Sequence, residues 1–207
     1  MKVRAKICGI TSFEDASQAV EAGADALGFV FYQNSPRYIS PEQAANICKK
    51  LPPFVCKVGL FVDASRKEIN EICQAVELDL LQFHGAEQEE DCVGFSLPYI
   101  KAIKVQNSKD LESAENEYPS AKAILVDTFK QGVPGGTGER FDWTLLPEQR
   151  LKPLILAGGL NEKNIYQAIR SVRPYAVDVS GGVEQVKGKK NHRTVTQFLN
   201  EVSRACE

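Results

Sequence analysis

The sequence predicts an α/β protein, a single-domain (β/α)8 TIM barrel that occupies residues 1–207. Three observations lead to this prediction: eight short apolar runs recur along the chain, segments of helical periodicity separate most of them, and no linker or low-complexity stretch interrupts the pattern. Strict alternation of strands and helices implies a parallel sheet covered by helices, and eight repeats suffice to close a barrel. The length of 207 residues is at the short end for this fold.

The expected strands are rich in Val, Ile, Leu and Phe. Side chains alternate between the two faces of a strand, so Lys6 and Cys8 share one face of the first strand. The other face is apolar and suits a layer of helices, so Lys6 and Cys8 should point into the barrel. The same alternation places Asp127 on the same face of the sixth strand as Ala123 and Leu125, opposite Ile124 and Val126. The eight strands are expected at Val3–Cys8, Asp25–Phe31, Val55–Val62, Leu78–His84, Tyr99–Val105, Ala121–Asp127, Pro153–Ala157 and Ala176–Ser180.

The intervening segments carry helix signals. Ser12 is followed three residues later by Asp15, and Ser40 precedes Pro41 at a first helical position. The weakest helical pattern lies at Phe141–Arg150. A doubly wound open sheet is the alternative fold, but the first strand is not followed by the G-x-G-x-x-G sequence of a dinucleotide site. The clearest helices are expected at Ser12–Ala22, Pro41–Leu51, Ser65–Val76, Ala86–Phe95 and Asn164–Val172.

Composition argues against several classes of function. The formal net charge of -2 gives no basic field for nucleic acid, and no apolar stretch approaches the ~20 residues that span a bilayer. The six cysteines include no C-x-x-C pair and no histidine at metal-ligand spacing, so we expect no structural zinc site. Without a signal-peptide pattern after Met1, we expect a cytoplasmic protein without nucleic-acid or membrane partners. Either a monomer or a homodimer is compatible with the sequence.

Paired glycines follow the seventh and eighth strands, at Gly158-Gly159 and at Gly181-Gly182 after Ser180. Residues without a Cβ let backbone N–H groups approach a phosphate, and barrel enzymes often bind phosphate between these two loops. The hydroxyl of Ser180 can add a donor. The sequence therefore predicts a phosphorylated small-molecule substrate, with two simple tight turns as the alternative.

Cys8 and Asp127 end the first and sixth strands, so both should lie at the mouth of the barrel, where barrel enzymes carry their chemistry. A thiol with a pKa of about 8.5 is a poor base at neutral pH unless a nearby charge lowers that value. Lys6, on the same expected face, is a candidate for that charge. The alternatives are a packed thiol for Cys8 and a structural ion pair for Asp127.

Other polar residues also follow strands. Arg37 lies after the second strand, and its guanidinium suits a carboxylate or a second phosphate, although a surface arginine is the alternative. His84 ends the fourth strand and can line the pocket, while Asp178 can be a buried carboxylate. The glycine-rich segment 128–140 is long enough for a substrate lid, with a flexible connection as the alternative.

The chain resembles the phosphoribosylanthranilate isomerase family over nearly all of its length. Single matching pieces would carry little weight, but nine pieces occur in the family's order. They are Lys6–Thr11, Gly28–Tyr32, Ser35–Ser40, Val58–Val62, Leu80–Gly85, Val126–Thr128, Gly135–Gly138 with Phe141–Trp143, Ala157–Asn161 and Val177–Glu184.

The resemblance implies an Amadori rearrangement of N-(5-phosphoribosyl)anthranilate in tryptophan biosynthesis, without metal or cofactor. By the family pattern, Asp127 protonates the ring oxygen and Cys8 removes the proton from C2′. Arg37 matches the arginine that holds the anthranilate carboxylate, and the turns at Gly158-Gly159 and Ser180–Gly182 match the phosphate site.

Two alternatives remain open. One is a related sugar-phosphate barrel, such as the histidine-pathway isomerase, which resembles a doubled half-barrel and has an aspartate where this chain has Cys8. The other is a non-catalytic barrel that binds a phosphorylated metabolite, for which an acid and a base at the mouth would have no explanation.

Overall fold

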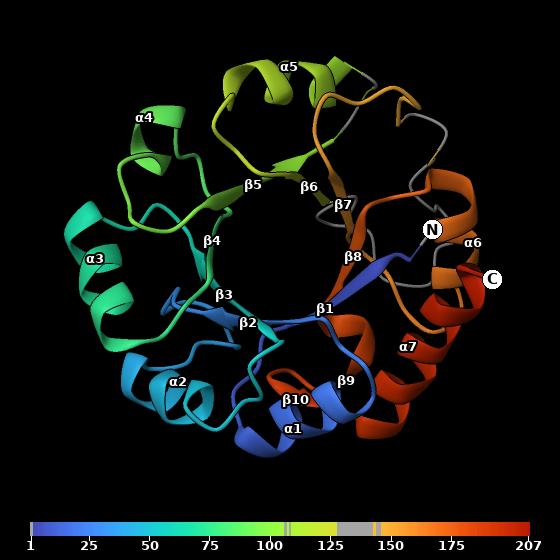
Figure 1. Cartoon of the computed structure of the whole chain (residues 1–207), viewed down its shortest axis with the longest axis horizontal. Helices are drawn as coiled ribbons and strands as arrows, with labels where there is room; N and C mark the ends of the chain where they lie inside the picture. Colours follow the sequence, from blue (N-terminus) through green and yellow to red (C-terminus); the bar gives the residue numbers. More distant parts are fainter. Residues whose placement is uncertain (1, 106, 108, 128–142, 144–145) are drawn as a thin grey trace.

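The computed structural model describes residues 2–105, 107, 109–127, 143 and 146–207. Eight parallel strands pair in chain order, and the last pairs with the first to close a barrel, which confirms the predicted fold (Figure 1). The strands are β1 (Arg4–Cys8), β2 (Ala26–Val30), β3 (Cys56–Phe61), β4 (Leu80–Phe83), β5 (Tyr99–Lys104), β6 (Ile124–Asp127), β7 (Leu154–Ala157) and β8 (Ala176–Val179).

Helices surround the ring of strands. Ser12 caps the first helix by accepting a hydrogen bond from the backbone N–H of Asp15, and Ser40 and Gln43 form a capping box at the second. Both caps were signalled by the sequence. The helices are α1 (Phe13–Glu21), α2 (Pro41–Cys48), α3 (Arg66–Ala75), α4 (Glu89–Cys92), α5 (Lys109–Glu117), α6 (Ile165–Val172) and α7 (His192–Ala205).

Two helix predictions were too long. The helix expected at Ala86–Phe95 is the single turn α4, because the Glu87 carboxylate accepts hydrogen bonds from the backbone N–H groups of Asp63 and Gly85 and holds the preceding residues in a loop. Of the segment 141–150, residues 146–150 form no helix and the other described residue, Trp143, lies in a 3-10 turn.

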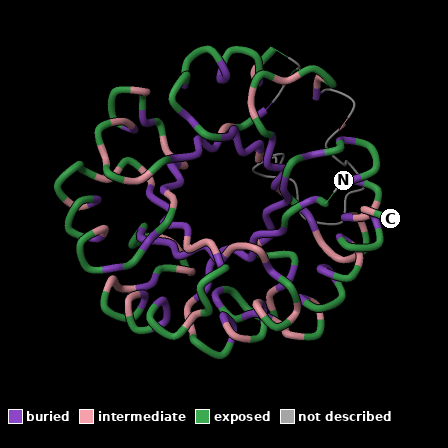
Figure 2. Tube along the Cα trace, in the orientation of Figure 1, coloured by how far each residue is buried: buried purple, intermediate pink, exposed green. Residues whose placement is uncertain are grey.

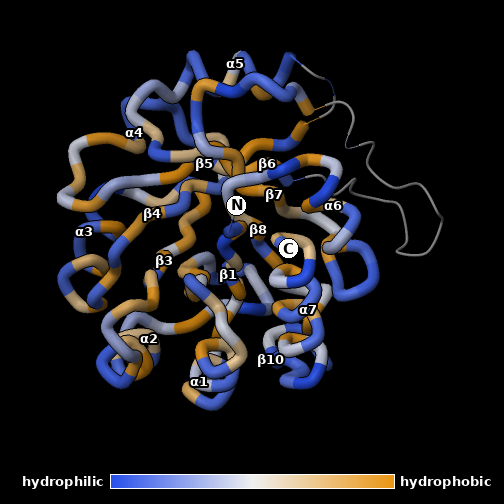
Figure 3. The backbone as a smooth tube through the Cα atoms, turned by 45° about the vertical axis from the view of Figure 1, so that its right-hand side comes forward, coloured by the Kyte–Doolittle hydropathy of each residue, from blue (hydrophilic) through white to orange (hydrophobic). Residues whose placement is uncertain are grey.

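The main hydrophobic core lies between the barrel and its helices. Leu27, Phe29, Phe61 and Phe83 on the outer faces of their strands are at most 1% exposed. Figure 2 shows buried residues following the ring of strands and the inner sides of the helices, and Figure 3 shows that hydrophobic residues concentrate on the strands. None of the described helices is both long and apolar enough to cross a membrane.

A short hairpin follows the eighth strand and was not predicted from the sequence. After a 3-10 turn at Gly181–Val183, strands β9 (Glu184–Val186) and β10 (Lys189–Lys190) pair in antiparallel fashion. The hairpin brings Glu184 and Lys190 back over the C-terminal end of the barrel, next to the loop that follows β2.

Candidate active site

Cys8 ends β1 with its side chain inside the barrel, and the residue is only 4% exposed. Gly28 on the neighbouring strand β2 makes room for it, because a Cβ at Gly28 would lie 2.7 Å from Cys8 Sγ and 2.9 Å from Lys6 Cε. The expectation that Lys6 and Cys8 share the inner face of β1 is confirmed by these contacts.

A buried polar cluster lies below Cys8. Its members are Lys6, Gln82 on β4 and Asp178 on β8, and each is less than 9% exposed. Lys6 Nζ donates to Gln82 Oε1 at 2.9 Å and to Asp178 Oδ1 at 2.8 Å. The ammonium group is therefore held by one amide oxygen and one carboxylate across the barrel interior.

Burial raises the pKa of the Cys8 thiol above its ordinary value, while the positive charges of Lys6 and Lys190 lower it in part. The expected direction of the Lys6 effect on the thiol pKa is thus correct, but desolvation outweighs it. A thiolate formed here is a stronger base than an ordinary one, because basicity increases with pKa.

Asp127 ends β6 and His84 follows β4, so that the two side chains face each other across the mouth of the barrel. His84 Nε2 lies 3.6 Å from Asp127 Oδ2, and both side chains are about one-quarter exposed. On its other side, His84 Nδ1 lies 3.1 Å from Gln82 Nε2. A partly exposed carboxyl group beside an imidazole is suited to proton transfer with a ligand in the mouth.

Arg37 is not an ordinary surface arginine. Its Nε and Nη2 donate to the two carboxylate oxygens of Glu184, both at 2.7 Å. Lys190 Nζ, which is fully buried, donates to the same carboxylate at 3.1 Å. Glu184 is thus bound by two cations, which fixes the guanidinium at the rim of the site.

The loops after β7 and β8 pack directly against each other. A Cβ at Gly182 would lie 1.9 Å from the carbonyl oxygen of Leu160, so only glycine allows this approach. Gly158 and Gly159 adopt positive φ angles of 84° and 64°. The turns that were predicted to form one site therefore lie together.

Ser180 belongs to the same corner. A Cβ at Gly9 would lie 3.0 Å from its Oγ and 2.6 Å from Arg37 Cδ, so the β1 loop, the serine and the arginine converge. Among the described residues, the Ser180 hydroxyl is a buried side-chain group with no hydrogen-bond partner. Such a group is expected where a ligand supplies the missing partner.

The structure joins the predicted residues into two groups. Gly9, which follows Cys8, lies against Arg37 and Ser180 near the glycine turn at Gly181, while His84 and Asp127 face each other elsewhere on the mouth. The proposed lid, 128–140, lies outside the described residues. Sequence reasoning missed Gln82, Glu184 and Lys190; a polar residue inside the apolar run Leu80–Phe83 was the available signal for Gln82.

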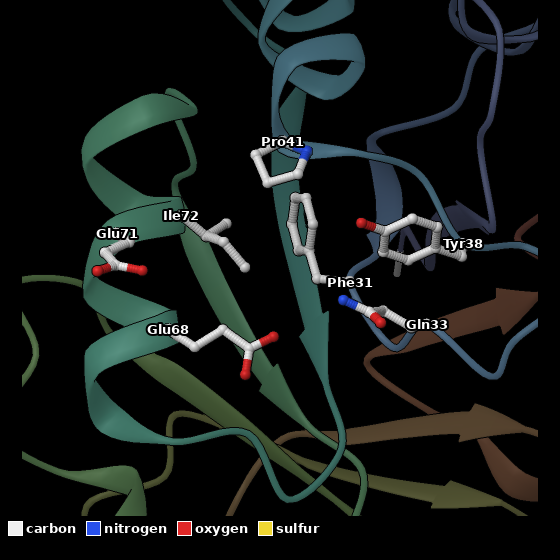
Figure 4. Close-up of a pocket in the computed structure, with 7 residues that line it drawn as sticks. All are labelled: Phe31, Gln33, Tyr38, Pro41, Glu68, Glu71 and Ile72. Atoms are coloured by element: carbon white, nitrogen blue, oxygen red, sulfur yellow. The ribbon is translucent and has the colours of Figure 1, made fainter.

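A separate pocket of about 380 Å³ lies outside the barrel, between α2 and α3. Figure 4 shows Glu68 and Ile72 on α3 facing Phe31, with Tyr38 on the opposite side and Pro41 above the Phe31 ring. Its lining includes none of the predicted site residues. Among the described residues, no group of three His, Cys, Asp or Glu side chains is placed to hold a metal ion.

Comparison with known proteins gives consistent matches over almost the whole chain. Residues 5–201 match the family described as N-(5'phosphoribosyl)anthranilate (PRA) isomerase. The chain is 59% identical over 200 residues to the N-(5'-phosphoribosyl)anthranilate isomerase of Pseudomonas fluorescens strain Pf0-1, which covers 97% of this chain and 98% of the relative.

Solved structures agree with this match. The phosphoribosyl anthranilate isomerase of Thermotoga maritima is 47% identical, with a TM-score of 0.90 and coverage of 98% of this chain and 99% of that one. A phosphoribosyl anthranilate isomerase in complex with reduced 1-(o-carboxyphenylamino)-1-deoxyribulose 5-phosphate is 45% identical, with a TM-score of 0.87 and the same coverage.

Proposed function

The chain belongs to the N-(5'-phosphoribosyl)anthranilate isomerase family, and we propose that Cys8 and Asp127 are the general base and the general acid of its reaction. It is an isomerase of tryptophan biosynthesis, and the reaction is the Amadori rearrangement of N-(5-phosphoribosyl)anthranilate to 1-(2-carboxyphenylamino)-1-deoxyribulose 5-phosphate. The main support for the two roles is that the thiol of Cys8 and the carboxyl group of Asp127 end two strands of one closed barrel, with the unpartnered Ser180 hydroxyl close to Gly9, the residue after Cys8.

The reaction divides between the two groups. The carboxylic acid of Asp127 gives its proton to the furanose ring oxygen, the bond from that oxygen to C1′ breaks, and the nitrogen lone pair forms the C=N bond of a protonated Schiff base. The thiolate of Cys8 then takes the proton from C2′, and the electron pair of that C–H bond forms a C1′=C2′ bond while the C=N electrons return to nitrogen. The resulting enolamine loses its hydroxyl proton and gains one at C1′ to become the ketone.

The substrate is held at its two ends in this proposal. The phosphate binds the backbone N–H groups of Gly158-Gly159 and Gly181-Gly182 and the hydroxyl of Ser180, which has no partner among the described residues. Arg37 binds the anthranilate carboxylate through N–H groups of Nη1 and Nη2, because its bonds to Glu184 use only the Nε–H and one N–H of Nη2. His84 contacts the sugar beside Asp127. We also infer that the enzyme acts in the cytoplasm, as a monomer or homodimer.

The experiment follows the loss of anthranilate fluorescence from freshly made N-(5-phosphoribosyl)anthranilate. We expect wild type to turn over, and Cys8→Ala and Asp127→Asn each to lose roughly 10²–10⁴-fold in kcat, the usual contribution of a general acid or base. Cys73→Ala, which removes a half-buried thiol on the outer helix α3, is the matched control and should retain wild-type rates.

If both site variants keep wild-type kcat, the assignment of acid and base is wrong. If wild type binds the substrate but leaves it unchanged, this chain does not catalyse the rearrangement, and the interpretation as a non-catalytic barrel that binds a phosphorylated metabolite is the better one.

A further inference from the structure

We propose that Gln82 is a positioning residue that holds His84 in the tautomer with the proton on Nε2, so that His84 presents an N–H donor to the carboxyl group of Asp127. The functional consequence rests on the proposed role of Asp127 as general acid. The tautomer itself follows from hydrogen-bond chemistry inside the barrel and can be measured independently.

The first step fixes the orientation of the Gln82 side chain. Gln82 is fully buried, and its Oε1 lies 2.9 Å from Lys6 Nζ. An ammonium group donates hydrogen bonds and cannot accept them, so the oxygen of the amide must face Lys6. Lys6 is itself held in place at 2.8 Å by Asp178. The amide nitrogen of Gln82 must therefore face the other way, toward His84.

The second step fixes the proton on the ring. Gln82 Nε2 lies 3.1 Å from His84 Nδ1. An amide NH2 group donates hydrogen bonds, so Nδ1 must supply a lone pair, and in a neutral imidazole the single ring proton is then on Nε2. Nε2 is the atom that lies 3.6 Å from Asp127 Oδ2.

The third step is chemical. Once Asp127 has given its proton to the ring oxygen, it carries a negative charge that an N–H donor stabilises, whereas the opposite tautomer would direct a lone pair at that charge. The 3.6 Å separation exceeds an ordinary hydrogen bond, but such contacts often tighten only when substrate binds. A glutamine amide is a poor proton carrier, so we assign Gln82 to positioning and not to proton transfer.

The first test is nuclear magnetic resonance of protein labelled with ¹⁵N-histidine. The chain has two histidines, His84 and His192, so the ring signals are few, and His192→Gln identifies those of His84. At a pH where the ring is neutral, we expect the ¹⁵N shift of His84 Nδ1 to be that of an unprotonated nitrogen and the shift of Nε2 that of a protonated one. A protonated Nδ1 with an unprotonated Nε2 would overturn the proposal.

The second test changes the partner of the ring. In Gln82→Glu, a carboxylate can accept from both Lys6 and His84, so Nδ1 should gain a proton in the ¹⁵N spectrum. We expect kcat to fall roughly tenfold to a hundredfold, with little change in KM. Losses of this size follow the removal of the hydrogen-bond partner that orients a histidine in metal sites. Gln88→Glu, the same charge change at an exposed position, is the matched control and should leave both constants unchanged.

A double-mutant cycle separates positioning through His84 from a general loss of structure. In a His84→Ala background, Gln82→Glu should cost little further kcat, whereas a purely structural role would give additive losses. A Gln82→Glu enzyme with a changed tautomer but wild-type kcat would overturn the proposed consequence while leaving the acid and base assignments intact. If Gln82→Glu fails to fold, the wild-type ¹⁵N spectrum still decides the tautomer.

Discussion

The interior of the barrel has two unlike regions. One is the polar cluster of Lys6, Gln82 and Asp178, contributed by β1, β4 and β8. The other is an apolar cluster contributed mainly by β5 to β8 and packed against Leu80. Both are buried, but the side chains of one are held by charge and hydrogen bonds and those of the other pack as a hydrophobic cluster. The apolar cluster consists of Ile100, Ala102, Ala123, Leu125, Ile155, Ala157 and Ala176.

The two regions should differ in how well they tolerate substitution. A methyl group lost from an apolar cluster leaves a small cavity, whereas one partner lost from a buried ion pair leaves an uncompensated charge. The polar cluster also contacts the site, through Lys6 beside Cys8 and through Gln82 beside His84. Substitutions there should therefore change stability and chemistry together, while those in the apolar cluster should change stability alone.

The largest effect is expected from Lys6→Met, which leaves Asp178 buried without its cation. Breaking a buried pair in this way costs about 3–5 kcal/mol in the free energy of unfolding, measured by urea denaturation at pH 7. Burial alone lowers the pKa of Lys6, but Asp178 and then Cys8 outweigh it and raise it above 10.5. The contribution of Lys6 is therefore fully present at pH 7 and is lost only at alkaline pH above that value.

The double variant Lys6→Met with Asp178→Leu provides the control. It removes both charges and should recover part of the loss, since an apolar replacement of a whole buried pair is often neutral or stabilising. Lys6→Met should also raise the pKa of the Cys8 thiol further. In a pH titration the thiolate absorbance of Cys8, identified by its loss in Cys8→Ser, should then appear at higher pH than in wild type. Equal unfolding free energies for Lys6→Met and wild type would show that the ion pair of Lys6 with Asp178 does not stabilise the barrel.

The sequence was sufficient to predict the features of the barrel that depend on local pattern. Alternation along β1 placed Lys6 and Cys8 inside, and paired glycines marked the loops after β7 and β8. It could not predict features that depend on distant partners. Lys6 binds Asp178, which lies 172 positions away along the chain. Glu184 binds both Lys190 of the same hairpin and the distant Arg37, and local sequence pattern does not reveal the second contact.

A smaller effect is expected where the polar cluster meets Cys8. In Gly28→Ala, the added Cβ would lie 2.7 Å from Cys8 Sγ and 2.9 Å from Lys6 Cε, so both side chains must move. Overpacking of this kind costs about 1–3 kcal/mol of unfolding free energy, and we expect kcat to fall because the proposed base is displaced. Stability should partly recover in Gly28→Ala with Cys8→Ala, where the nearest clash is removed; no recovery would point to strain elsewhere on β2.

The smallest effect is expected in the apolar region, from Ile155→Val on β7. Ile155 is 8% exposed and packs in the interior cluster, so the loss of one methyl group should cost about 0.5–1.5 kcal/mol in the free energy of unfolding. Its kcat and KM should equal those of wild type, because the side chain has no polar contact with the mouth. Steady-state rates and urea denaturation of the same preparation check both parts. A larger loss of kcat in Ile155→Val than in Gly28→Ala would show that the apolar cluster also positions Asp127. Both regions would then affect catalysis, and they would differ only in the size of the effect.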